Sequence, residues 1–145
     1  MSTNIPRLNL IPLENAITSL EQLQARVADQ QFMAAQDQVV RQGLQAGLIQ
    51  NLEFTYELCW KSIRRWLETN VSPEVADGVT RRELFRLAAE NLLIDDVDEW
   101  MRYHAARNDT SHQYYRALAE ETLALMADFA RAARRLLNNL KARND

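Results

Sequence analysis

Side chains that could do acid–base chemistry on a phosphate gather in one short polar run. This run is Arg107-Asn108-Asp109-Thr110-Ser111-His112-Gln113-Tyr114-Tyr115, and it has no apolar residue among its first seven positions. Histidine is the side chain best suited to proton transfer near neutral pH. Arginine is a permanent cation whose planar fork fits phosphate oxygens. Arg107 and His112 are therefore candidates for chemistry on a phosphate-containing substrate.

The spacing of this pair decides how it could form one site. His112 follows Arg107 by five positions, and on an ideal helix this places the two side chains about 140° apart. They can serve one site only if the helix breaks between them, or if a symmetric pair of chains shares the site. Residues 108–111 are all poor helix-interior residues and good cap or turn residues, so a break is compatible with the sequence. Both alternatives stay open, because such a spacing is a weak signal by itself.

Composition indicates an ordered helical protein. The 145 residues are 47% hydrophobic with three Gly and three Pro, and the net charge of -3 provides no global basic field for nucleic acid. The single Cys59 excludes an intrachain disulfide and, lying between Leu58 and Trp60, is predicted to be a buried small hydrophobe. No apolar run approaches the ~18 residues of a membrane span, and no signal pattern begins the chain. We therefore expect a cytoplasmic protein that makes no membrane contact.

Apolar residues recur at three- and four-residue steps, which predicts amphipathic helices. Residues 1–12, with two Pro, are expected to form a flexible leader, and residues 13–141 a single helical domain. Helices are expected at about 13–32, 37–70, 81–92, 96–107 and 117–141, the third of them opening with a capping box at Thr80 to Glu83. The predicted fold class is all-α, an antiparallel up-and-down bundle of four or five helices.

The second predicted helix carries a narrow polar stripe on an otherwise apolar surface. Because it is apolar nearly all round between Leu48 and Leu67, we expect it to face both its own bundle and a second subunit. The stripe consists of Gln50, Glu53, Glu57, Lys61 and Arg64. One interpretation is a solvated ladder of opposite charges at i, i+4 spacing. The other places Glu53 and Glu57 inside, orienting Arg107 or His112.

The remaining polar features have ordinary interpretations beside functional ones. Arg81, Arg82 and Arg86 form either a basic patch for RNA or a solvated helix face, and both alternatives stay open. His104 has no partner at metal-ligand spacing and is interpreted as a surface or interface residue. No Cys/His cluster, Gly-rich phosphate loop or Ser-His-Asp arrangement is visible, so neither a metal nor a cofactor is expected.

Two separated motifs resemble those of a known family. Residues 49–61, IQNLEFTYELCWK, resemble the "IQ-x-FEFTFELAWK" signature of the bacterial nucleotidyltransferase substrate-binding proteins. The later pattern "DD…W…RN-x-x-SH-x-Y" of that family is matched by Asp95-Asp96, Trp100, Arg107-Asn108, Ser111-His112 and Tyr114. The resemblance runs from about residue 13 to 140 with order and spacing kept. Leu52 stands where the family usually has Phe, an apolar change that affects no functional position.

This family belongs to the HEPN superfamily, and the resemblance carries several implications. It implies a helical bundle like the C-terminal domain of kanamycin nucleotidyltransferase, usually a homodimer, often encoded beside a small MNT-type nucleotidyltransferase. Many HEPN proteins are metal-independent ribonucleases with an Arg-x4–6-His site at the dimer interface, and several are toxins. Carried over by position, the resemblance implies Arg107 and His112 as the catalytic pair, Asn108 as the supporting polar residue, and Tyr114 as the tyrosine to which the partner adds AMP in some pairs. Further candidates for supporting or orienting this pair are Glu53, Glu57, Lys61 and Ser111.

Three hypotheses therefore remain. In the first, the chain is the ribonuclease toxin of a two-component system, with His112 as general base or acid and Arg107 on the scissile phosphate. In the second, it is a non-catalytic subunit that binds nucleotide for a separately encoded nucleotidyltransferase. In the third, the polar run is a helix break satisfied by its own side chains. The expected ligands are RNA or nucleotide, and no cofactor is expected.

Overall fold

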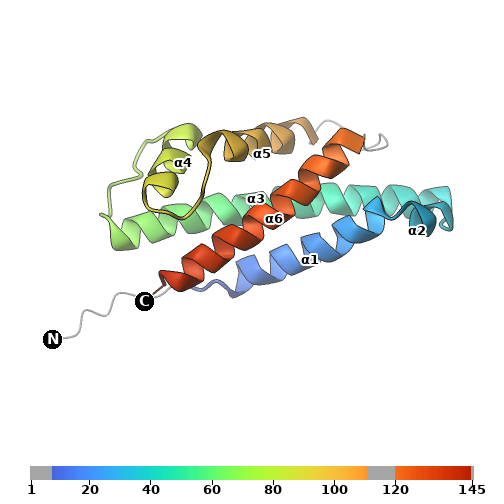
Figure 1. Cartoon of the computed structure of the whole chain (residues 1–145), viewed down its shortest axis with the longest axis horizontal. Coiled ribbons are helices and arrows are strands. Elements are labelled where there is room, and N and C mark those ends of the chain that lie inside the picture. Colours follow the sequence, from blue (N-terminus) through green and yellow to red (C-terminus); the bar gives the residue numbers. More distant parts are fainter. Residues whose placement is uncertain (1–7, 111–119, 145) are drawn as a thin grey trace.

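The computed structural model describes residues 8–110 and 120–144, and this part of the chain contains six helices and no strand. They are α1 (Ile11–Ala28), α2 (Gln30–Ala34), α3 (Gln38–Asn70), α4 (Arg81–Glu90), α5 (Val97–Thr110) and α6 (Glu120–Ala142). Helices α1, α3, α5 and α6 alternate in direction and pack on one another, while the short α4 packs on α3 and α5 near one end (Figure 1). The predicted all-α, up-and-down bundle is therefore confirmed.

The start of the bundle differs from the prediction. Leu8 and Leu10 are buried, and the Leu8 backbone N–H donates to Asn144 Oδ1 at 2.9 Å near the other end of the described chain. Helix α1 begins at Ile11, two residues earlier than expected, because Pro12 fits the first helical turn, where its missing N–H is not needed. The boundary drawn after residue 12 is thus too late for residues 8–12, and residues 1–7 lie outside the described part.

The single helix predicted for residues 13–32 is wrong, because α1 ends at Ala28 and α2 starts at Gln30. Asp29 between them adopts an extended conformation, and its side chain accepts a hydrogen bond from the Phe32 backbone N–H at 3.1 Å. An aspartate at a helix N-cap satisfies a backbone donor that has no partner inside the helix. The cap therefore competes successfully with continuation of the first helix.

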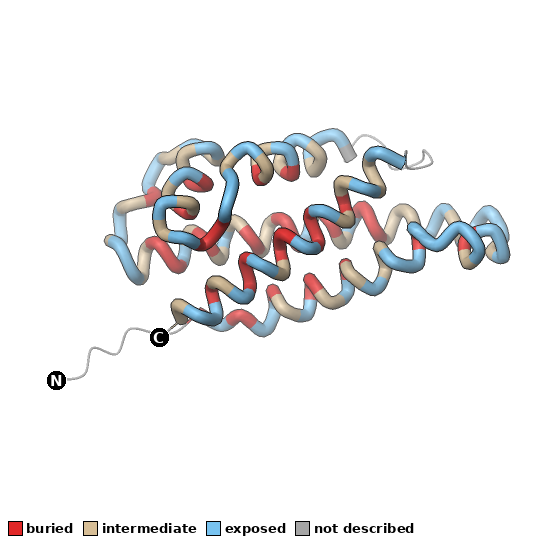
Figure 2. Tube along the Cα trace, viewed as in Figure 1, coloured by how far each residue is buried: buried red, intermediate tan, exposed pale blue. Residues whose placement is uncertain are grey.

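Helix α3 is the longest element and begins where expected. Asp37 is its N-cap, with its side chain accepting from the Val40 backbone N–H at 2.8 Å. The helix stays continuous through Gly43 and Gly47: a Cβ at Gly43 would meet open space, and one at Gly47 would lie 3.4 Å from the Leu23 side chain. Neither glycine is thus required by a close backbone approach. The first turns of α3 and the neighbouring α2 are mostly exposed, whereas its later turns are buried (Figure 2).

A cluster of aromatic rings joins α4 and α5 to the rest of the bundle. The rings are Tyr56 on α3, Phe85 on α4, Trp100 and Tyr103 on α5, and Phe129 on α6, all at most 2% exposed. Their contacting pairs have centroids 5.2 to 6.4 Å apart in tilted or edge-to-face arrangements. Aromatic pairs in such geometry contribute beyond the area they bury. The cluster therefore fixes where α4 and α5 lie against α3.

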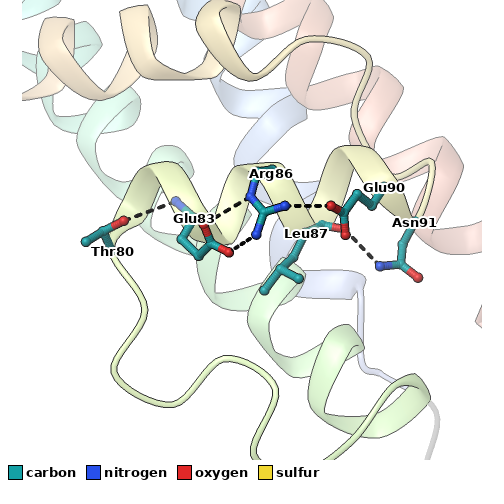
Figure 3. Close-up of polar contacts among 6 residues, drawn as sticks. All are labelled: Thr80, Glu83, Arg86, Leu87, Glu90 and Asn91. Carbon is teal, nitrogen blue, oxygen red and sulfur yellow. Dashed lines mark hydrogen bonds and ion pairs between the residues drawn. The ribbon is translucent and has the colours of Figure 1, made fainter.

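Of the two hydrogen bonds that the predicted capping box of α4 would contain, the structure shows the one to the Thr80 side chain. The Thr80 hydroxyl accepts from the Glu83 backbone N–H at 3.1 Å, as an N-cap threonine should (Figure 3). The Glu83 carboxylate pairs with Arg86 instead of turning back to the cap. The helix ends at Glu90, two residues earlier than predicted. Leu92 has a φ of 61°, and Leu93 N–H donates to the Ala88 carbonyl at 2.9 Å, so a Schellman motif ends α4.

The later helices also shift at their ends. Helix α5 extends to Thr110, so Asn108 and the two residues after it are helical, against the prediction of an end at residue 107. Residues 111–119 lie outside the described part, and with them the rest of the expected break. Helix α6 starts at Glu120 and ends at Ala142, close to the expected 117–141. Within the described ranges, no helix has the length and apolarity needed to cross a membrane.

Candidate functional site

Arg107 lies in the last turns of α5 and is joined to α3 by an ion pair. Its Nη2 is 3.4 Å from Glu57 Oε1, and both side chains are 33% exposed. The Glu57 carboxylate also accepts from Trp60 Nε1 at 2.9 Å and lies 4.0 Å from Lys61 Nζ. Glu57 therefore takes part in the i, i+4 pair of the polar stripe and also forms an ion pair with Arg107, and its role in orienting Arg107 stays a prediction.

The other predicted site residues are placed less closely or not at all. Glu53 makes no ion pair with any residue that the structure describes. Asn108 follows Arg107 on α5 and is exposed, as is Lys61 on α3. Ser111, His112 and Tyr114 lie outside the described residues. The structure thus brings Arg107 and Glu57 together, and the pairing of Arg107 with His112 stays a prediction.

His104, interpreted from the sequence as a surface or interface residue, contacts a core tyrosine. Its Nδ1 lies 2.7 Å from the Tyr56 hydroxyl oxygen, and the two rings are 5.7 Å apart. Burial lowers the pKa of His104, and the positive charges of Arg81 and Arg107 lower it further. Burial also raises the pKa of the Tyr56 hydroxyl, so this group keeps its proton. The one sequence signal was the three-residue step from His104 to Arg107, which places them on one face of α5.

Arg81 completes the group of cations around these residues. Its Cζ lies 3.6 Å from the Trp60 ring centroid and 5.9 Å from that of Tyr56, so the guanidinium rests against the face of the indole. Its Nη1 is buried and has no hydrogen-bond acceptor within the described part of the chain. Sequence reasoning treated Arg81 as one member of an arginine cluster and missed this placement.

The two arginines that follow on α4 point elsewhere. Arg82 Nη1 is 3.2 Å from Asp98 Oδ1. Arg86 Nη1 is 2.8 Å from Glu90 Oε1, as Figure 3 shows. These side chains are 61% and 54% exposed. Their charges are therefore matched by carboxylates on an open surface, which favours the solvated-face interpretation for these two residues. The basic-patch alternative therefore does not describe a single surface of three arginines.

The structure also bears on thiol chemistry and on metal binding near the site. Cys59 is fully buried and its burial raises the pKa of the thiol, as expected for a small hydrophobic residue. Among residues 8–110 and 120–144, no group of three or more His, Cys, Asp or Glu side chains is arranged to hold a metal ion.

Comparison with known proteins supports the resemblance. The family model described as "Nucleotidyltransferase substrate binding protein like" matches residues 8–142, almost the whole chain. The chain belongs to this family. One curated relative, the probable ribonuclease HepT of Haemophilus influenzae strain Rd, is 34% identical to this chain over 139 residues, which are 95% of each of the two chains.

A solved structure agrees with this assignment. A Haemophilus influenzae protein, reported to reveal the fold of a substrate-binding domain of a nucleotidyltransferase, superposes with a TM-score of 0.84 at 33% identity. The match covers 92% of this chain and 99% of that one. The family and its helical fold, both expected from the sequence motifs, are therefore confirmed.

Proposed function

We propose that this protein is an HEPN-type ribonuclease, the toxin of a two-component system with an MNT-type nucleotidyltransferase, and that Arg107 and His112 form its catalytic pair. The observation that carries the proposal is the position of Arg107, half-buried and held by Glu57 five residues before His112. Similarity to the probable ribonuclease HepT over 95% of the chain supports the same reaction class.

The chemistry follows from the two side chains. As general base, His112 takes the proton of a ribose 2′-hydroxyl while its oxygen attacks the adjacent phosphorus, or as general acid it protonates the 5′-oxygen as the P–O5′ bond breaks. The O2′–P bond forms as the P–O5′ bond is lost, leaving a cyclic phosphate and a 5′-hydroxyl. Arg107 binds the scissile phosphate and stabilises the negative charge that develops on it. Asn108 and Ser111 support this pair.

A homodimer is part of the proposal. Phe54 on α3 is 58% exposed, a large apolar side chain on the helix expected to face a second subunit. Two sites that face each other across a dyad would allow Arg107 and His112 to cooperate without lying on one helix face. In this arrangement the cytoplasmic nucleotidyltransferase partner would silence the toxin by adding AMP to Tyr114, next but one to His112.

Growth and RNA cleavage test the proposal together. Cells expressing the chain alone should stop growing, and the purified protein should cut RNA without added metal. His112→Ala and Arg107→Ala should each lower cleavage by about a hundred-fold or more and restore growth. Arg102→Ala, which removes an exposed arginine from the same helix, is the matched control and should remain toxic. If the wild type is harmless and leaves RNA intact, the ribonuclease proposal fails.

A second function is favoured by a different observation. The superposed Haemophilus influenzae structure was reported as a substrate-binding domain, which supports a non-catalytic subunit that binds nucleotide for its partner enzyme. In that case ATP should bind the purified chain, Arg107→Ala should abolish binding, and RNA should stay intact. RNA cleavage that depends on His112 would exclude this alternative.

A further inference from the structure

Three hydrogen-bond donors from two helices converge beside one carboxylate. Arg81 comes from α4, and His104 and Arg107 come from α5. Their positive charges reach the same two side chains, since Arg81 and Arg107 both lower the pKa of His104 and both act on Tyr56. Among the described residues, Glu57 is the carboxylate whose charge also acts on both of these groups. His104 and Tyr56 are therefore each acted on by the positive charges of two guanidinium groups and by the negative charge of Glu57.

The contact with Tyr56 determines which nitrogen of His104 carries its proton. Tyr56 is 1% exposed, and its hydroxyl has no other hydrogen-bond partner among the described residues. If His104 Nδ1 were the donor, the phenolic proton would be buried without an acceptor, which costs free energy. The hydroxyl therefore donates to Nδ1, and the proton of the neutral imidazole is on Nε2. His104 thus presents an N–H donor on the side away from Tyr56.

Arg81 is held in place without being neutralised. Its guanidinium carbon lies over the Trp60 ring, and no carboxylate of the described chain forms an ion pair with it. Its neighbours Arg82 and Arg86 are both paired in that way. A stacked, unpaired guanidinium with a buried nitrogen lacking an acceptor is a preorganised binding group for an anion with several oxygens.

We propose that Arg81, His104 and Arg107 together bind a phosphate group of a ribonucleotide, with Arg81 and His104 as binding residues beyond the Arg107–His112 pair. The ligand is a phosphate group, either of an RNA strand or of a free nucleotide. The inference rests on the proposed function only in taking the ligand to be a ribonucleotide. Glu57 then has the role of orienting Arg107 toward this phosphate.

Binding of two uncleavable probes tests the assignment. A short 2′-O-methyl oligouridylate and ATP are titrated separately into the full chain at one fixed ionic strength. Arg81→Ala and His104→Ala should each weaken binding by about ten-fold to a hundred-fold, the loss expected for a hydrogen bond to a charged group. Arg82→Ala and Arg86→Ala remove the same charge from the same helix and should change affinity less than about two-fold. Whichever probe shows this pattern identifies the source of the phosphate.

A spectroscopic measurement covers the case in which Arg81→Ala does not fold. The chain has two histidines, so His112→Ala in untagged protein leaves His104 as the single imidazole. Its ¹⁵N shifts should show the proton on Nε2, and the Nε2 signal should move when the probe binds. Tyr56→Phe should change the tautomer balance. A proton on Nδ1, or an Nε2 signal unmoved at saturating probe, would overturn the proposal.

The outcomes for the two proposals are separable. One outcome is that unmodified RNA stays intact while the affinity for at least one probe still falls in Arg81→Ala and His104→Ala. In that case the ribonuclease proposal fails and the phosphate site stands. If RNA is cut in a His112-dependent way while Arg81→Ala and His104→Ala bind both probes like the Arg82→Ala control, the phosphate site is wrong and the ribonuclease stands.

Discussion

The arginines on two faces of α4 have opposite surroundings. On the outer face of α4, Arg82 and Arg86 reach carboxylates of Asp98, Glu83 and Glu90 in open solvent. On the inner edge, one residue earlier, Arg81 lies against the ring of Trp60 and its buried Nη1 has no acceptor within the described chain. In the outer group the two positive charges are more than balanced by three carboxylates in open solvent, whereas Arg81 on the inner edge has no carboxylate partner among the described residues.

The difference shows that residue type and local cluster do not determine the role of a cation. Exposed ion pairs contribute little to stability, because water screens them and their side chains lose freedom. A guanidinium on an aromatic face is partly desolvated and oriented, so it can act on a bound anion. We therefore expect substitutions on the inner edge to have large effects and those on the outer face to have small ones.

The largest expected effect on stability is at Tyr56, whose ring contacts His104 and lies beside Arg81 on the inner edge of α4. Tyr56→Ala should lower the free energy of unfolding by about 3–5 kcal/mol, because it leaves a cavity within the aromatic cluster. Tyr56→Phe keeps the ring and should cost only about 1 kcal/mol, the value of the hydrogen bond to His104. Urea denaturation measures both.

Val39→Ala, at a 78% exposed position of the same helix, is the control and should stay within ~0.5 kcal/mol of the wild type. A Tyr56→Ala protein as stable as this control would show that the inner edge does not depend on the aromatic cluster.

An intermediate effect is expected at the cap of the helix that carries both groups of arginines. Thr80→Ala removes the acceptor for the Glu83 backbone N–H and should cost about 1 kcal/mol by denaturation. Thr80→Ser keeps a hydroxyl at the cap and should restore most of that loss. Since the first turn positions Arg81, the alanine variant should also weaken probe binding more than Arg82→Ala does. Equal binding by the two variants would mean that the cap does not position Arg81.

The smallest effect concerns pH. Burial and the charges of Arg81 and Arg107 lower the pKa of His104 in the folded chain below its ordinary 6.5. Between that lowered pKa and 6.5 the unfolded chain binds a proton that the folded chain does not, so stability rises with pH through this window. The contribution is complete above about pH 6.5 and is lost as the pH falls through the folded-state pKa.

Denaturation midpoints measured across this window in a His112→Ala background isolate the effect, because His104 is then the single histidine. His104→Asn should flatten the curve, and the charges of Glu57, Arg81 and Arg107 that act on the ring stay in place. An unchanged slope in the asparagine variant would contradict the assignment.

Local signals in the sequence were reliable where one short segment decides the outcome. The cap at Thr80 and the start of α3 near Asp37 were predicted, because both depend on residues within one turn. The break at Asp29 follows the same rule, but the sequence analysis extended the first helix past it to residue 32. The overlooked contacts are of another kind: Tyr56 and His104 are 48 positions apart, and no local pattern relates them.

The sequence by itself determined the helical class, the family and the identity of Arg107 as a candidate, because periodicity, caps and motif spacing are written along the chain. The tertiary structure alone decided which of three similar arginines on α4 faces the interior and which histidine meets a buried tyrosine. The physical reason is that each residue turns a helix by about 100°. Neighbouring side chains therefore reach different surroundings, and only the packing of the aromatic rings determines which face is buried.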